Sequence, residues 1–305
     1  MSTIILHHYD VSPYSEKLRA LFGYTNMAWQ SSITEEMPPR RKLKPLAGNY
    51  GRIPVAQIGA DIFCDSNLIC SELSRITAKP ELALEGCSAD VNDFVRRVEG
   101  DIFFACVMAG STNKLHRRIL KSVGIKGFAR LLIDRLNMSR KAKIKMVSML
   151  DANKIALRFL EELEGRLVND FLFGSQPNIA DFSAYHCIWF MRDLGGRNVV
   201  KNYPRTLIWL DTIKAMGEGE RDEINPQQAL DIAKHETPRE ITVEDAQSDY
   251  LGKAVSIAPN DYRLDATVGI LVGESDQRWI IARENSDVDR VHVHFPKAGF
   301  ELTLV

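Results

Sequence analysis

The stretch Arg52–Ser66, RIPVAQIGADIFCDS, decides the fold. It predicts a strand that begins at a proline, a tight turn, a second short strand and a polar pair that starts a helix. Proline has no N–H to donate, so a sheet accepts it only at an edge, at a strand start or at a bulge. There the backbone N–H and C=O of Ile53 can pair with a molecule outside the sheet. Asp65 and Ser66 precede apolar residues at helical spacing, and a helix N-terminus is a natural site for a carboxylate. The stretch therefore predicts a groove for a short, extended, acidic peptide.

The composition predicts an ordinary soluble globular protein of two or three domains, with 305 residues, 45% of them apolar and 26% charged. No run of about 18 apolar residues occurs, so we expect no membrane span. The N-terminus lacks a basic leader and a long apolar core, so we expect no signal peptide and a cytoplasmic location. The five cysteines are odd in number and lack C-x-x-C or other metal spacing, which predicts reduced, mostly buried thiols and no metal site.

Charge is unevenly distributed along the chain. Residues 116–146 contain ten Lys or Arg and one acid, Asp134, whereas residues 218–249 contain ten acids and three basic residues. A basic stretch can serve nucleic acid, an anionic membrane or an acidic ligand. We favour a solvated helical face that pairs with the acidic segment, because aromatic residues for base stacking are almost absent there. We therefore expect no nucleic-acid partner.

Residues 1–82 alternate strand and helix signals. Strands are predicted at 3–8 and 29–33, with a helix between them that begins at Ser12 as N-cap and Pro13 as first residue. An irregular loop over 37–51 leads to the two strands and helix of the opening stretch. A helix between strands favours a parallel pair, and the short turn at Gly59 favours a hairpin. The order β-α-β-loop-β-β-α predicts a four-stranded mixed sheet.

Residues 83–235 predict an all-helical domain, because no convincing strand run occurs there. One long helix is expected over 90–108 and another over 150–168, and helices at 204–216 and 226–233 complete the domain. Residues 182–191 are apolar on nearly all sides, which predicts a central core helix. Its start at Asn178 and Asp181 is a capping-box variant.

Residues 236–305 predict a small, β-rich domain. Short alternating runs occur at 253–257, 266–272, 278–282, 290–295 and 300–305, separated by turns rich in Gly, Asn, Asp and Ser. Five strands in so short a segment indicate a small barrel or a curled sheet.

The first two parts together resemble the cytosolic glutathione transferase family. The segment Ser12–Arg19, SPYSEKLR, is similar to the segment that carries the family's catalytic Ser, Cys or Tyr. Ile53-Pro54-Val55 resembles its cis-proline segment, Asp65-Ser66 its Glu/Asp-Ser pair, and Asn178–Phe182 its helical capping box, with Asn in place of Ser or Thr. The resemblance covers about 225 residues and implies a thioredoxin-like domain followed by an all-helical domain. It does not extend to the last 70 or so residues.

The resemblance implies a glutathione site at the opening stretch. The backbone of Ile53, beside a cis Ile53-Pro54 bond, would pair with the cysteinyl part of glutathione. Ser66, the helix N-terminus and Asp65 would hold the γ-glutamyl end, and Arg52 is the nearest candidate for the glycyl carboxylate. The loop over 37–50 departs from the common family pattern.

Ser12 is the implied catalytic residue and would donate a hydrogen bond to the thiolate. A thiol of pKa about 8.5 must drop by about two units to be mostly ionised at neutral pH, which corresponds to roughly 2.7 kcal/mol. A hydrogen bond to a charged group offers roughly 1.5–3 kcal/mol, and a helix N-terminus adds about 0.3–1 kcal/mol. A hydroxyl at a helix start is therefore sufficient without a general base. Tyr9 and Tyr14 are alternative donors.

Two functions follow from the resemblance. The first is an enzyme that uses glutathione as co-substrate and directs its thiolate at a small hydrophobic electrophile held by the helical domain. Members of the family usually dimerise, so a homodimer is expected. The second is a non-catalytic binding or regulatory protein, which uses the scaffold and the β-rich domain to contact protein partners. Fold does not decide between them.

Overall fold

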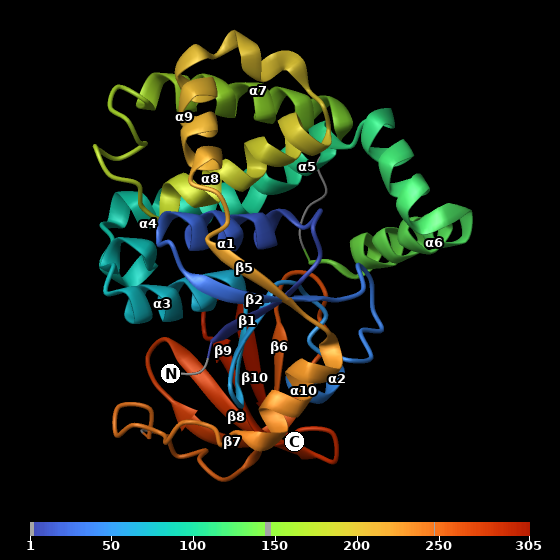
Figure 1. Ribbon diagram of the computed structural model, residues 1–305, viewed down its shortest axis with the longest axis vertical. Helices are drawn as coiled ribbons and strands as arrows, with labels where there is room; N and C mark the ends of the chain where they lie inside the picture. The colour runs from blue at the N-terminus through green and yellow to red at the C-terminus, as the bar shows by residue number, and fades with distance from the viewer. Residues whose placement is uncertain (1–2, 144–147, 247) are drawn as a thin grey trace.

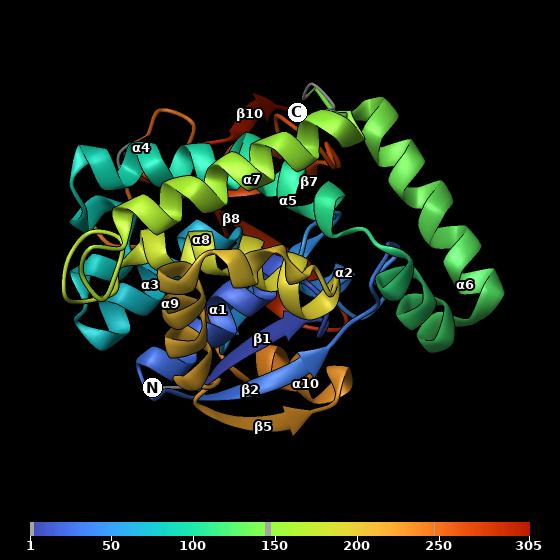
Figure 2. The ribbon, with the colours of Figure 1, turned by 90° about the horizontal axis from the view of Figure 1, so that it is seen from above.

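The computed structural model describes residues 3–143, 148–246 and 248–305. Most helices gather on one side of the molecule, and the C-terminal strands lie on the other (Figure 1). The N-terminal strands lie between the two groups. In both views helix α6 (Asn113–Lys141) projects away from the other helices (Figures 1 and 2).

The N-terminal part is the predicted α/β unit. Its elements are β1 (Ile4–His8), α1 (Pro13–Tyr24), β2 (Ala28–Ile33), the short α2 (Lys44–Ala47), β3 (Val55–Ile58), β4 (Asp61–Cys64) and α3 (Ser66–Thr77). Strand β1 runs parallel to β2 and antiparallel to β3, which pairs antiparallel with β4. Helix α1 begins after Ser12, whose Oγ accepts the N–H of Ser15 at 3.3 Å. The predicted mixed sheet and N-cap are confirmed.

Helices follow from residue 80 to residue 215, connected by short segments. They are η1 (Pro80–Leu82), η2 (Leu84–Gly86), α4 (Ala89–Arg97), η3 (Val98–Ile102), α5 (Phe103–Gly110), α6, α7 (Met149–Arg166), α8 (Ile179–Trp189), η4 (Phe190–Leu194), η5 (Asn198–Asn202) and α9 (Pro204–Ala215). The single helix predicted over 90–108 is wrong, because the backbone leaves helical geometry at Gly100. The chain therefore forms α4 and α5 on either side of the π-helical segment η3.

Helix α8 forms the centre of the helical part. All eleven of its residues are buried. The capping box at its start is confirmed: the Asn178 side chain accepts from the N–H of Ala180, and Asp181 Oδ2 accepts the N–H of Asn178. Asp181 Oδ1 also accepts from the Trp209 indole at 2.9 Å, which connects α8 to α9.

A strand, β5 (Glu220–Ile224), follows α9 and pairs parallel with β2. The prediction of no strand before residue 235 is wrong at this point. The segment reads ERDEI and lacks an apolar alternation, because β5 is the last strand of the sheet and its side chains are partly or fully exposed. Helix α10 (Pro226–His235) then buries Leu230 and Ala233 in a core shared with the C-terminal strands.

The five predicted C-terminal strands are present. They are β6 (Ala254–Pro259), β7 (Thr267–Glu274), β8 (Arg278–Asn285), β9 (Asp289–Pro296) and β10 (Phe300–Leu304). Strand β9 pairs parallel with β4, with Ile62 opposite Val293. One ten-stranded sheet therefore runs through the described part of the chain in the order β10-β6-β7-β8-β9-β4-β3-β1-β2-β5. The division of the chain at 82/83 and 235/236 stays a prediction.

The basic stretch lies mainly on α6. Its acid, Asp134, pairs with Arg263 from the loop between β6 and β7. The favoured pairing of this stretch with the acidic residues 218–249 stays a prediction. Lys145 lies outside the described residues. Among the residues that the structure places, no helix is long and apolar enough to cross a membrane.

Candidate functional site

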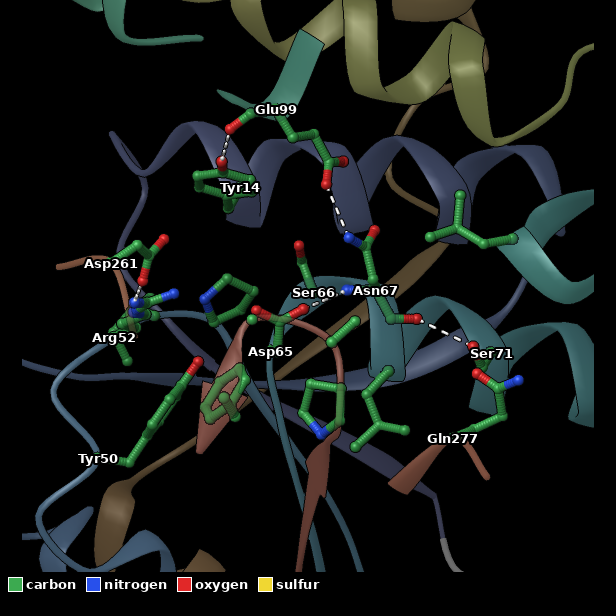
Figure 3. Close-up of a pocket in the computed structure, with 18 of the residues that line it drawn as sticks. Tyr14, Tyr50, Arg52, Asp65, Ser66, Asn67, Ser71, Glu99, Asp261 and Gln277 are labelled. Carbon is green, nitrogen blue, oxygen red and sulfur yellow. Dashed lines mark hydrogen bonds and ion pairs between the residues drawn. The ribbon is translucent and has the colours of Figure 1, made fainter. Parts of the chain in front are cut away.

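A cavity of about 360 Å³ lies where the predicted site residues meet the helices and the C-terminal strands (Figure 3). Arg52, Ile53, Pro54, Asp65 and Ser66 all line it. Each was selected from the sequence, and the structure brings them together. A volume of this size lies within the range of small-molecule sites.

The strand edge of the cavity is formed by Ile53 and Pro54, which precede β3. The Ile53-Pro54 peptide bond is cis, as the resemblance implied. The main-chain N–H and C=O of Ile53 have no hydrogen-bond partner in the described part of the chain. An extended ligand can therefore pair with this edge as an added strand does.

The second wall is the start of α3. Asp65 is the N-cap, and its carboxylate accepts the N–H of Asn67 at 2.9 Å. Its φ of 84° is unusual for a residue with a side chain, and such conformations concentrate at functional sites. Burial raises the pKa of Asp65. The Ser66 hydroxyl has no hydrogen-bond partner among the described residues, and this side of the cavity presents main-chain N–H groups.

Arg52 is held by the loop between β6 and β7. Its Nη2 donates to the carboxylate of Asp261 and, at 2.5 Å, to the carbonyl of Tyr262. Its guanidinium lies 4.0 Å from the centre of the Tyr262 ring. The Nε of Arg52 is buried without a partner among the described residues. The guanidinium therefore retains a donor, but Asp261 neutralises its charge.

Glu99 lies on the opposite side of the cavity, in the irregular segment between α4 and α5. Its Oε1 contacts Lys17 Nζ at 2.5 Å and accepts from Ser183 at 2.7 Å, and its Oε2 accepts from Asn67 at 2.8 Å. Burial opposes the charge, but the Lys17 ammonium holds the pKa of Glu99 below its ordinary value. This carboxylate joins α1, α3 and α8 around the site.

Ser12 does not line the cavity. It is 2% exposed and caps α1. Of the two alternative donors, Tyr9 is also absent from the lining, whereas Tyr14 is part of it. The Tyr14 hydroxyl donates to the carbonyl of Glu99 at 3.1 Å (Figure 3).

Three tyrosines line the cavity: Tyr14 from α1, Tyr50 from the loop before β3, and Tyr262 from the loop between β6 and β7. The hydroxyl of Tyr50 points toward the space between Arg52 and Asp65 (Figure 3). Burial raises the pKa of all three phenols above the ordinary value. They therefore stay protonated at neutral pH and can donate hydrogen bonds.

The sequence did not predict several of the residues that line the cavity. Glu99 carried no motif, and Asp261, Tyr262 and Gln277 belong to the C-terminal part, which the family resemblance did not cover. No local signal connects them to Arg52, which is 209 residues from Asp261 along the chain. Among the described residues, no group of three or more His, Cys, Asp or Glu side chains is placed to hold a metal ion.

Comparison with family models gives two matches. Residues 6–81 match the model of the glutathione S-transferase N-terminal domain, and residues 137–214 match that of the C-terminal domain. Together the matches span about half of the chain. No curated protein matches the chain.

Solved structures with similar folds include a GST-like protein from Pseudomonas syringae, which is 28% identical, with a TM-score of 0.80 and coverage of 100% of both chains. A glutathione S-transferase from Rhodospirillum rubrum is 19% identical over 70% of this chain and 88% of that chain, with a TM-score of 0.49. A glutathione transferase family member from Pseudomonas fluorescens, solved with two glutathione bound, is 14% identical over 71% of this chain and 93% of its own, with a TM-score of 0.47.

Proposed function

The chain belongs to the glutathione S-transferase family, and on that premise we propose that it binds glutathione in the cavity beside Pro54 and Ser66. One observation carries the proposal. The unpaired main chain of Ile53, next to a cis proline, and the N-terminus of α3 line the same cavity. Glutathione is a short, extended, acidic peptide, which is the kind of ligand that an open strand edge beside an anion site fits.

Each end of glutathione has a candidate partner. The backbone of Ile53 pairs with the cysteinyl unit. The Ser66 hydroxyl, the N–H groups of the first turn of α3 and the cap residue Asp65 hold the γ-glutamyl end. The glycyl carboxylate lies toward the guanidinium of Arg52, which lines the cavity. Because Asp261 already occupies the Nη2 of this arginine, we assign the glycyl end a smaller share of the affinity than the γ-glutamyl end.

The proposed reaction is conjugation of glutathione to a small hydrophobic electrophile. The thiol proton leaves to water, and a sulfur lone pair forms the new bond to the electrophilic carbon as the leaving group departs with its bonding pair. Tyr14 lines the cavity, and its ring lies 4.6 Å from that of the buried Phe103; this aromatic wall is where such a substrate would bind. The role of Ser12 stays a prediction, which the Ser12→Ala variant tests.

A non-catalytic binding or regulatory protein is the second candidate. One observation favours it: Ser12, the residue expected to hold the thiolate, lies outside the cavity lining. The same scaffold would then bind protein partners, with the C-terminal strands as added surface.

Retention on glutathione resin, followed by a thiol-conjugation assay, separates the two candidates. Retention with turnover supports the enzyme, and retention without turnover supports the binding protein. A wild-type protein that is not retained contradicts the enzyme and its glutathione site, and leaves the protein-binding candidate. Activity that survives Ser12→Ala assigns the thiolate to another donor.

We also propose a homodimer and a cytoplasmic location, both on the basis of family membership. Sedimentation velocity across a concentration series tests the first. A single monomer species at all concentrations would contradict it. Fractionation of the native cells tests the second.

A further inference from the structure

We propose that Tyr262, in the loop between β6 and β7, is a catalytic residue of this site and donates the hydrogen bond that holds the glutathione thiolate. This inference rests on the proposed function, because it needs glutathione in the cavity. It gives the C-terminal strands a part in the chemistry that the matched family domains, at residues 6–81 and 137–214, do not include.

The loop is fixed to the strand edge of the cavity. The N–H of Tyr262 donates to Asp261 Oδ1 at 2.8 Å, and the same carboxylate pairs with Arg52. Arg52 also donates to the Tyr262 carbonyl, and its guanidinium lies 4.0 Å from the ring centre. Both the backbone and the ring of Tyr262 are therefore held against the residue that precedes Ile53.

The loop is also fixed to the helices. Arg263 donates to Asp134 of α6 at 2.8 Å, and the N–H of Lys143 donates to the carbonyl of Asp261 at 2.7 Å. The Tyr262 ring meets Phe104 of α5 edge-on, with the ring centres 5.7 Å apart. The ring thus lies between the strand edge and the helical part. A cysteinyl sulfur paired at Ile53 must face this region to reach an electrophile held by the helices.

The hydroxyl of Tyr262 is available, unlike those of two of its rivals. Tyr262 lines the cavity, and its hydroxyl has no hydrogen-bond partner among the described residues. The Tyr14 hydroxyl is already committed to the Glu99 carbonyl, and Ser12 lies outside the lining. Tyr50 is the remaining rival, because its hydroxyl also lacks a partner in the described chain.

The chemistry requires a donor that keeps its proton. The glutathione thiol loses its proton to water, and the sulfur then accepts the phenolic O–H. Burial raises the pKa of Tyr262, although the Arg52 cation opposes this. The phenol therefore stays neutral where the thiolate forms. A hydrogen bond to a charged group lowers the thiol pKa by about one to two units.

The test is the pKa of glutathione in the binary complex, measured by the ultraviolet absorbance of the thiolate over a pH series. It needs binding but no turnover. The variants are Tyr262→Phe, Tyr14→Phe and Tyr50→Phe. The matched control is Tyr250→Phe, a tyrosine in the C-terminal part that is 44% exposed and does not line the cavity.

Among the variants, we expect only Tyr262→Phe to raise the thiol pKa, by about one to two units. Its glutathione dissociation constant should stay within about threefold of wild type, which corresponds to a change of under 0.7 kcal/mol in binding free energy. An unchanged thiol pKa in Tyr262→Phe overturns the inference while the proposed function stands. The same upward shift in Tyr50→Phe or Tyr14→Phe instead reassigns the donor and also overturns it. A wild-type protein that binds no glutathione contradicts the proposed function, and this inference with it.

Discussion

Replacing Lys17 with methionine tests the ion pair that joins Glu99 of the helical part to helix α1 of the N-terminal part. The Lys17 side chain is 0% exposed, and its Nζ lies 2.5 Å from Glu99 Oε1. It also donates to Asn67 Oδ1 at 2.8 Å. Methionine keeps most of the aliphatic chain but removes the charge and the donors. The substitution therefore isolates the cost of leaving Glu99 buried without its cation.

The expected loss follows from the burial of the pair. Breaking a buried ion pair by removing one partner costs about 3–5 kcal/mol, because the remaining charge stays desolvated. Glu99 keeps the hydrogen bonds from Ser183 and Asn67, which places the expected loss near the lower end, about 3 kcal/mol. Without Lys17 the pKa of Glu99 rises above its unfolded value. The deficit of the variant should then grow as pH increases through that raised pKa and shrink at acid pH.

Equilibrium urea unfolding followed by tryptophan fluorescence measures the loss. The control is Arg96→Met, which removes an ion pair with Asp93 whose side chains are 77% and 69% exposed; it should cost less than about 1 kcal/mol. The double variant Lys17→Met, Glu99→Gln should be more stable than Lys17→Met, because no unpaired charge remains. A Lys17→Met loss below about 1 kcal/mol, or a double variant less stable than the single one, would refute the reasoning.

Other variants test separate parts of the structure. Burial lowers the pKa of His186 to about 4 from 6.5, so the folded state binds fewer protons than the unfolded state between these pH values. His186 should lower the free energy of unfolding by up to about 3 kcal/mol from pH 6.5 to pH 4. The buried His7 and His292, whose pKa is also lowered to about 4, add to the same slope. His186→Phe should therefore reduce the slope by its own share; an unchanged slope would contradict the burial. Leu230→Ala should lower the free energy of unfolding by about 2–5 kcal/mol, because Leu230 is 2% exposed in the core that α10 shares with the C-terminal strands. A loss under about 0.5 kcal/mol would mean that α10 does not pack there.

Local signals made the N-terminal part predictable. The cap at Ser12, the proline that opens the strand at residue 54 and the polar pair Asp65-Ser66 each act within a few residues of the chain. The capping box at Asn178 is equally local. Capping and turn chemistry involve neighbouring residues, so one sequence is enough to locate them.

The missed elements depend on distant partners. Strand β5 has four charged residues in five and is a strand because β2 offers it a free edge. The break in helical geometry at Gly100 has no proline that would predict it. The pairing of β9 with β4 joins strands more than 200 residues apart, and no alternation pattern specifies which edge a strand will find.

The site residues also fall into two groups, those that local sequence signals predict and those that depend on distant parts of the chain. The residues proposed to face glutathione, Arg52, Ile53 and Ser66, follow from the order of motifs, and the structure places them on one cavity. The neighbours that set their electrostatics do not follow from it. Asp261 neutralises Arg52 from the loop between β6 and β7, and Glu99 lies at an unpredicted break between two helices. Both depend on tertiary packing.

Calorimetric titration of glutathione into the wild-type protein and into Ser66→Ala decides whether the cavity binds glutathione as proposed. Ser66 is 5% exposed at the start of α3, and its hydroxyl is assigned to the γ-glutamyl carboxylate. Loss of one hydrogen bond to a charged group corresponds to about 1.5–3 kcal/mol, or roughly a 10- to 150-fold weaker dissociation constant. We expect saturable binding by wild type and this weakening in Ser66→Ala, with unchanged thermal stability. No binding by wild type, or equal affinity in the variant, would contradict the proposed site.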